Sequence, residues 1–142
     1  MAESCTIYCK VVDLDEIARL LHSHFPSSSP TADDPLTVHE SDGSLRLTQK
    51  VFREPGDEFC RMMLGIRAFI KRIESADSSS QQAVVNHLDL CDLAIGVVAE
   101  PAFDADERYH AVVFAIAKAL DGVVFNGQEM LDANGVTLVA AA

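Results

Sequence analysis

The sequence predicts a single α+β domain in which helices pack on one face of a mostly antiparallel sheet. The 142 residues are enough for one domain. The segments that favour strand and helix follow one another as β-α-β-β-α-α-β-α-β-β-β, without the strict alternation that produces parallel sheets. No repeat and no long linker divides this order, so the predicted domain spans residues 1–142.

Seven short segments are predicted as strands because they alternate in polarity, or form apolar runs, between turn residues. They cover residues 6–12, 36–39, 45–51, 93–99, 123–125, 130–131 and 136–139. The run at 93–99 carries no charge, which is typical of a central strand buried on both faces. The strands at 36–39 and 45–51 flank an Asp-Gly turn and are therefore expected to form a hairpin.

Four segments carry apolar residues at helical spacing. They cover residues 14–25, 55–75, 80–89 and 107–120. Asp13 is expected to cap the first helix, because Glu16 follows it as in a capping box. Pro55 is predicted at the first helical position of the longest helix, and Asp104 or Asp106 as the cap of the last. The longest helix presents a continuous apolar stripe: Phe59, Met62, Met63, Ile66, Phe69, Ile70 and Ile73.

The chain is strongly acidic, with a net charge of −11, and residues 78–142 carry nine acidic and two basic side chains. Such a chain is expected to bind nucleic acid poorly, because binding to the phosphates requires lysine and arginine side chains. The negative electrostatic field of the chain favours association with a basic protein partner. The same charge also keeps a small protein soluble. The candidate partner-binding residues adjoin the predicted central strand and the last helix: Asp89, Asp92, Glu100, Asp104, Asp106 and Glu107.

Cellular location follows from what the chain lacks. No apolar run approaches the roughly 18 residues of a membrane span, and the first residues lack the pattern of a signal peptide. We therefore expect a cytoplasmic protein that contacts no membrane. The four cysteines, Cys5, Cys9, Cys60 and Cys91, form no Cys-x-x-Cys pair. They are predicted to be buried free thiols.

The sequence contains no recognisable catalytic motif. Glu107 and His110 have the spacing of one half of a di-iron site, but a second Glu-x-x-His is absent. An acidic first helical turn is favoured by the helix dipole and explains Glu107 without a metal. No nucleophile is paired with a base at a recognisable spacing, and no glycine-rich phosphate loop occurs. The sequence thus predicts a protein without catalysis, metal or cofactor.

The last third of the chain resembles a known class of proteins. The relevant stretches are Leu93-Ala-Ile-Gly-Val-Val-Ala-Glu-Pro101, the helix at 107–120, Leu120-Asp-Gly-Val-Val-Phe125 and Met130-Leu-Asp-Ala-Asn-Gly135. They are similar to the cytosolic immunity proteins of bacterial polymorphic-toxin and type VI secretion systems. The resemblance implies a stoichiometric inhibitor that blocks a cognate toxin's active site or substrate channel. It transfers no individual functional residue.

Two other functions remain open from the sequence. One is a small enzyme or ligand-binding domain whose site is assembled from separated residues such as His39, His87, Asp104 and His110. The other is a homo-oligomeric regulatory or structural protein, in which an edge strand at 136–139 pairs between copies.

Overall fold

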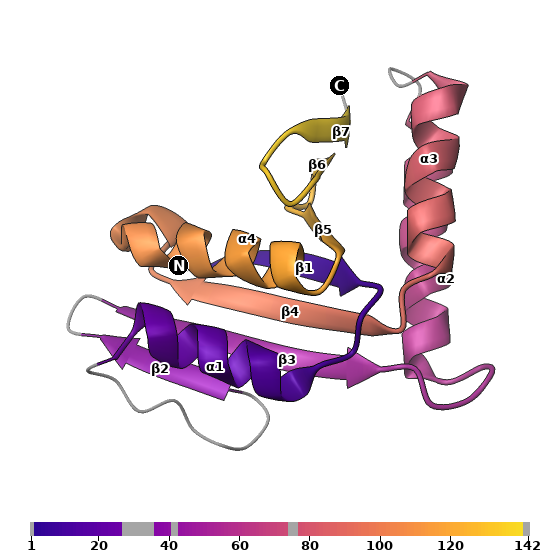
Figure 1. Ribbon diagram of the computed structural model, residues 1–142. Helices are drawn as coiled ribbons and strands as arrows, with labels where there is room; N and C mark the ends of the chain where they lie inside the picture. Colours follow the sequence, from indigo (N-terminus) through magenta and orange to yellow (C-terminus); the bar gives the residue numbers. More distant parts are fainter. Residues whose placement is uncertain (1, 27–35, 41–42, 74–76, 141–142) are drawn as a thin grey trace.

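A seven-stranded antiparallel sheet forms the centre of the protein (Figure 1). The computed structural model describes residues 2–26, 36–40, 43–73 and 77–140, so most of the predicted loop at 26–35 lies outside the described residues. The strands run in the order β2-β3-β4-β1-β5-β6-β7. Their bounds are β1 Glu3–Cys9, β2 Leu36–Glu40, β3 Gly43–Val51, β4 Leu93–Glu100, β5 Gly122–Phe125, β6 Glu129–Leu131 and β7 Thr137–Ala140. The predicted α+β class, the hairpin and the central position of β4 are confirmed.

The helices lie on both faces of the sheet, whereas the sequence predicted one. They are α1 Leu14–His24, α2 Glu58–Lys71, α3 Ser78–Asp89 and α4 Glu107–Ala119, with a short 3-10 turn η1 at Phe103–Ala105. Side chains alternate along a strand, so Ile7 of β1 packs in the core with α1 and α4, while Tyr8 packs with α2 and α3. A strand that is apolar on both faces must be packed against other elements on both. The α2–α3 pair packs on the second face, at one end of the sheet (Figure 1).

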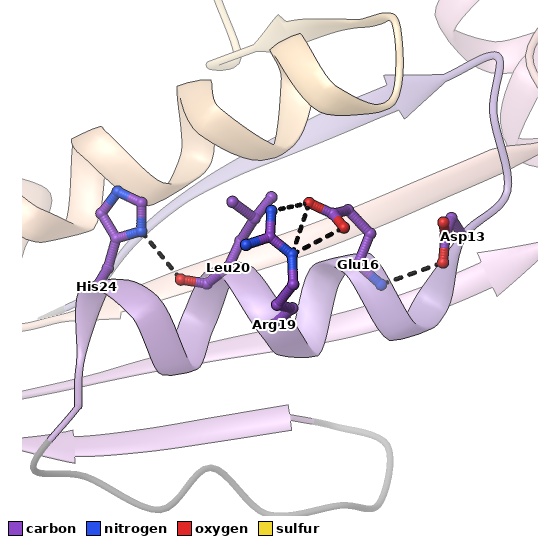
Figure 2. Close-up of polar contacts among 5 residues, drawn as sticks. All are labelled: Asp13, Glu16, Arg19, Leu20 and His24. Atoms are coloured by element: carbon purple, nitrogen blue, oxygen red, sulfur yellow. Dashed lines mark hydrogen bonds and ion pairs between the residues drawn. The ribbon is translucent and has the colours of Figure 1, made fainter.

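Local capping signals are reproduced in α1 (Figure 2). The Asp13 carboxylate accepts the backbone N–H of Glu16 at 3.1 Å, as predicted. Glu16 also forms an ion pair with Arg19, one turn along the exposed side. At the other end, the His24 ring donates to the Leu20 carbonyl at 2.9 Å, one turn back along the helix.

The first strand and the longest helix differ most from their predicted bounds. β1 spans Glu3–Cys9 rather than 6–12, because its ladder with β4 and β5 ends at Cys9; Val11 and Val12 are exposed. Helix α2 spans Glu58–Lys71 rather than 55–75. Asp57 takes the cap position there and accepts the N–H of Cys60 at 2.9 Å.

Helix α2 presents the predicted apolar stripe to the second core. Five of its members are buried: Phe59, Met63, Ile66, Ile70 and Ile73. Met62 and Phe69 are partly buried at the margin of the same core. None of the described helices is both long and apolar enough to cross a membrane.

Candidate partner-binding site

Six carboxylates gather where β4 ends, and we refer to them as the acidic end. They come from β1, β2, β4, η1, the cap residue between η1 and α4, and α4: Glu3, Glu40, Glu100, Asp104, Asp106 and Glu107. Strand register explains the gathering, because Glu3 lies opposite Ala99, Ser44 opposite Glu100, and Glu40 opposite Gly43. Strand β4 then delivers the chain directly into η1 and the first turn of α4.

Arg108 forms ion pairs with two of these carboxylates. Its guanidinium donates to both oxygens of Asp106, the closest contact being Nη2 to Oδ2 at 2.6 Å, and lies 3.7 Å from Glu40. Asp106 also caps α4 by accepting the N–H of Arg108 at 2.9 Å. The hydrogen bonds from the Arg108 side chain hold the pKa of Asp106 below its usual value. Asp106, not Asp104, is therefore the cap, and both Asp106 and Glu40 act within the fold.

The remaining acidic residues differ in their surroundings. Glu3 accepts the backbone N–H of Phe103 at 2.8 Å, which ties the start of β1 to η1. Glu100, Asp104 and Glu107 are exposed. Within the part of the chain that the structure describes, these three carboxylates form no ion pair. They are consequently available to a cation outside the chain.

An open groove of about 660 Å³ lies beside the acidic end. Its apolar lining comes from β1, α4, β5 and β6: Cys5, Val113, Phe114, Val124 and Leu131. Glu3 and Asp104 supply carboxylates, and His110 lies stacked on Phe103 with ring centroids 5.2 Å apart and 11° between planes. Among the described residues, no lysine or arginine lines the groove. Its volume is typical of a site for a small ligand or a few side chains.

Asp89 and Asp92 lie at the other end of the sheet. They precede the first residue of β4, whereas Glu100 is its last residue, and eight strand residues span roughly 23 Å. Asp89 forms an ion pair with Arg67 at 3.2 Å. The six candidate residues therefore do not form one surface, because Asp89 and Asp92 are separated from the other four.

The dispersed candidate site is not assembled either. Asp104 and His110 both line the groove. His39 is on β2, which β3 and β4 separate from β1. His87 is in the last turn of α3, beyond the opposite end of β4, where burial lowers its pKa. The described ranges contain no group of three or more His, Cys, Asp or Glu side chains that could hold a metal ion. Glu107 and His110 therefore belong to no such group.

All four cysteines are free thiols. Cys5, Cys9 and Cys91 are buried, and burial raises the pKa of each to about 12. A thiolate at these positions is therefore strongly disfavoured at neutral pH. Cys60 is half-buried, and its Sγ lies 3.7 Å from the Glu54 carbonyl.

Sequence reasoning missed Glu3, Glu40 and the groove. Glu3 was placed before the first strand rather than in it, and Glu40 one residue after the second. The only local signal was the acidic residue that borders each predicted strand. Their convergence depends on the register of β1, β3 and β4, which local patterns do not encode.

Comparison of the chain with protein-family models, with curated proteins and with solved structures finds no significant match.

Proposed function

We propose that this protein is a protein-binding module whose acidic end docks on a basic surface of a partner protein. The observation that carries the proposal is the convergence of exposed Glu100, Asp104 and Glu107, with no ion pair to a described residue. We further propose that the module is a cytoplasmic immunity protein and that the partner is a cognate bacterial toxin, which it inhibits without catalysis.

Electrostatics supports this use of the acidic end. Like charges held close together on a folded surface raise the local potential and speed the encounter with a partner of opposite charge. The effect acts over about 8–10 Å at physiological salt.

The immunity assignment rests on the sequence resemblance. The resembling stretches include Glu100 and Glu107, which are two of the six carboxylates of the acidic end. A toxin that acts on nucleic acid or nucleotides presents a basic surface to its substrate. An acidic inhibitor covers such a surface and excludes the substrate.

The test compares two triple variants that remove the same charge. E100Q/D104N/E107Q neutralises the exposed carboxylates of the acidic end. D15N/E54Q/D92N neutralises three exposed carboxylates elsewhere, and Asp15, like Glu107, lies in the first turn of a helix. The partner is the toxin encoded by the adjacent gene, co-expressed to measure protection and purified for stopped-flow association at two salt concentrations.

We expect the acidic-end variant to associate about tenfold more slowly at low salt, with a flatter salt dependence and reduced protection. The control variant should associate almost as the unchanged protein does. Equal association rates for the unchanged protein and the acidic-end variant would refute the role of the acidic end. A toxin that remains fully active in the presence of the unchanged protein would refute the immunity assignment.

A further inference from the structure

Strand β1 has neighbours of unequal length. On one side it pairs with β4 over Glu3–Cys9, but on the other it pairs with β5 over Thr6–Cys9 only. β5 ends at Phe125, and the chain then turns, with Asn126 donating its backbone N–H to the Glu129 carbonyl at 3.2 Å. Residues Glu3–Cys5 therefore border no strand on this side within the described ranges. Figure 1 shows β5 beside the arrowhead end of β1, away from the N-terminus.

The backbone groups of Ser4 face this open position. Lys10 donates its N–H to Asp121 on the β5 side, while Cys9 accepts the N–H of Asp92 on the β4 side. Backbone groups of an antiparallel strand alternate between its two neighbours. Tyr8, Thr6 and Ser4 therefore present their N–H and C=O groups toward β5. Ser4 lies beyond the last pair with β5, at an exposed position.

The groove lies at this same position. Glu3, Ser4 and Cys5 line it together with Asn126 and Gln128, which follow the last residue of β5. The apolar side chains of Val113, Phe114 and Leu131 border the space that a continued β5 would occupy. The groove is thus a slot about three residues long, with an unpaired strand edge, an apolar wall and carboxylates nearby.

We propose that an extended segment of the partner protein fills this slot as an added strand beside Glu3–Cys5, in line with β5. Strand addition uses main-chain hydrogen bonds for affinity and alternate side chains for specificity. Here one apolar side chain of the segment enters the groove, and a lysine or arginine two residues along, on the same face of the segment, meets the carboxylates of Glu3 and Asp104. This inference rests on the proposed function, because it names the part of the basic partner that the acidic end receives.

The slot is tested first without the partner. The probe is the peptide Ac-Lys-Thr-Val-Thr-Lys-NH2, whose valine and two lysines lie on one face of an extended strand. It is titrated into the ¹⁵N-labelled protein and followed by NMR. We expect amide shifts confined to Glu3–Cys5 and to the groove residues of α4 and β6. Methylation of the peptide's internal amides should weaken binding at least about tenfold, because it removes the main-chain hydrogen bonds. Equal binding of the methylated peptide, or shifts elsewhere, would overturn strand addition.

Charge selectivity is tested with the same peptide and with its counterpart carrying glutamate at the basic positions. We expect no binding of the acidic peptide. E3Q/D104N should weaken binding of the basic peptide about three- to tenfold at low salt, whereas E54Q/D92N, at the other end of the sheet, should not. The Gln side chain retains an oxygen for the Phe103 N–H, so the variant keeps that contact. Equal weakening by both variants would overturn the assignment of Glu3 and Asp104.

The partner is then tested with S4P. This change removes the one N–H that Ser4 directs into the slot and leaves the ladder with β4, which uses Glu3 and Cys5. We expect S4P to bind the toxin at least about tenfold more weakly. Normal toxin binding by folded S4P would overturn the slot and leave the proposed function intact. Peptide binding in the slot without any toxin binding by the unchanged protein would overturn the proposed function and leave the slot. If S4P does not fold, the methylated peptide decides.

Discussion

The guanidinium carbon of Arg108 lies 4.6 Å from the centroid of the Phe25 ring. Phe25 is the C-cap residue of α1 and is fully buried, while Arg108 belongs to the first turn of α4. The same guanidinium binds Asp106 and Glu40. Phe25 also packs against Tyr109 with ring centroids 5.9 Å apart. One pair of residues thus joins α1 and α4 beneath the acidic end.

We expect F25A to lower the free energy of unfolding by about 3–5 kcal/mol, as is usual for a buried aromatic side chain. R108A should lower the free energy of unfolding by less. The Arg108 side chain is partly exposed, and it contributes a cation–π contact with Phe25 and ion pairs with Asp106 and Glu40. Urea denaturation measures both variants. A larger loss for R108A than for F25A would contradict this order.

Two glycines should respond to alanine with opposite signs. A Cβ on Gly43 would lie 2.0 Å from the carbonyl oxygen of Glu100, so alanine must force β3 away from β4. We expect G43A to lower the free energy of unfolding by about 1–3 kcal/mol. Gly65 is exposed within α2 and has nothing within 4 Å of an added Cβ. G65A should therefore raise it by about 0.5–1 kcal/mol, since alanine favours helix. An unchanged or raised free energy of unfolding in G43A would contradict the close β3–β4 approach.

Ile66 and Leu64 lie on opposite faces of α2, one buried and one exposed. The side chain of Ile66 is 6% exposed, and that of Leu64 is 62% exposed. We expect I66A to lower the free energy of unfolding by about 2–5 kcal/mol. L64A should change it by less than about 0.5 kcal/mol. Thermal or urea unfolding distinguishes the two, and similar losses would mean that α2 is buried on the opposite face as well.

Asp57 should make stability depend on pH. Its carboxylate accepts the backbone N–H groups of Arg53 and Cys60, each at 2.9 Å, and of Glu54 at 3.2 Å. These hydrogen bonds, that of Arg53 foremost, hold the pKa of Asp57 well below its usual value.

Because the folded pKa is the lower one, ionised Asp57 stabilises the fold above the unfolded pKa of about 3.9. That contribution is lost as the pH falls through the folded pKa. D57A should therefore be less stable than the unchanged protein at pH 7, by a margin that shrinks below about pH 4. Urea denaturation over a pH series measures the margin, and a margin independent of pH would contradict this explanation.

The cysteines should react in two classes. We expect four free thiols in the denatured, unreduced protein. In the folded protein, Cys60 should react first with a thiol reagent at pH 8, because burial protects Cys5, Cys9 and Cys91 and raises their pKa to about 12. C60S should remove the fast phase. A fast phase that persists in C60S would show that one of the buried sites opens readily.

Short-range signals in the sequence determined much of this structure. The Asp13 cap, the hairpin of β2 and β3 and the apolar stripe of α2 depend on residues a few positions apart, so a local pattern contains them. The acidic excess of the last 65 residues was equally visible. The preference of aspartate for the helix N-cap position narrowed the predicted cap of α4 to Asp104 or Asp106, of which the structure selects Asp106.

The tertiary structure alone decided what these elements build together. β1 starts at Glu3 because its register is set by β4, about 90 residues away in sequence, and by β5 beyond it. The same pairing brings Glu3 to the acidic end, leaves Asp92 at the opposite one, and opens the slot beside Ser4. Helices occupy both faces because the apolar residues of the central strands face both ways. Such long-range pairings depend on which segments bury one another's surface, and no local spacing records that choice.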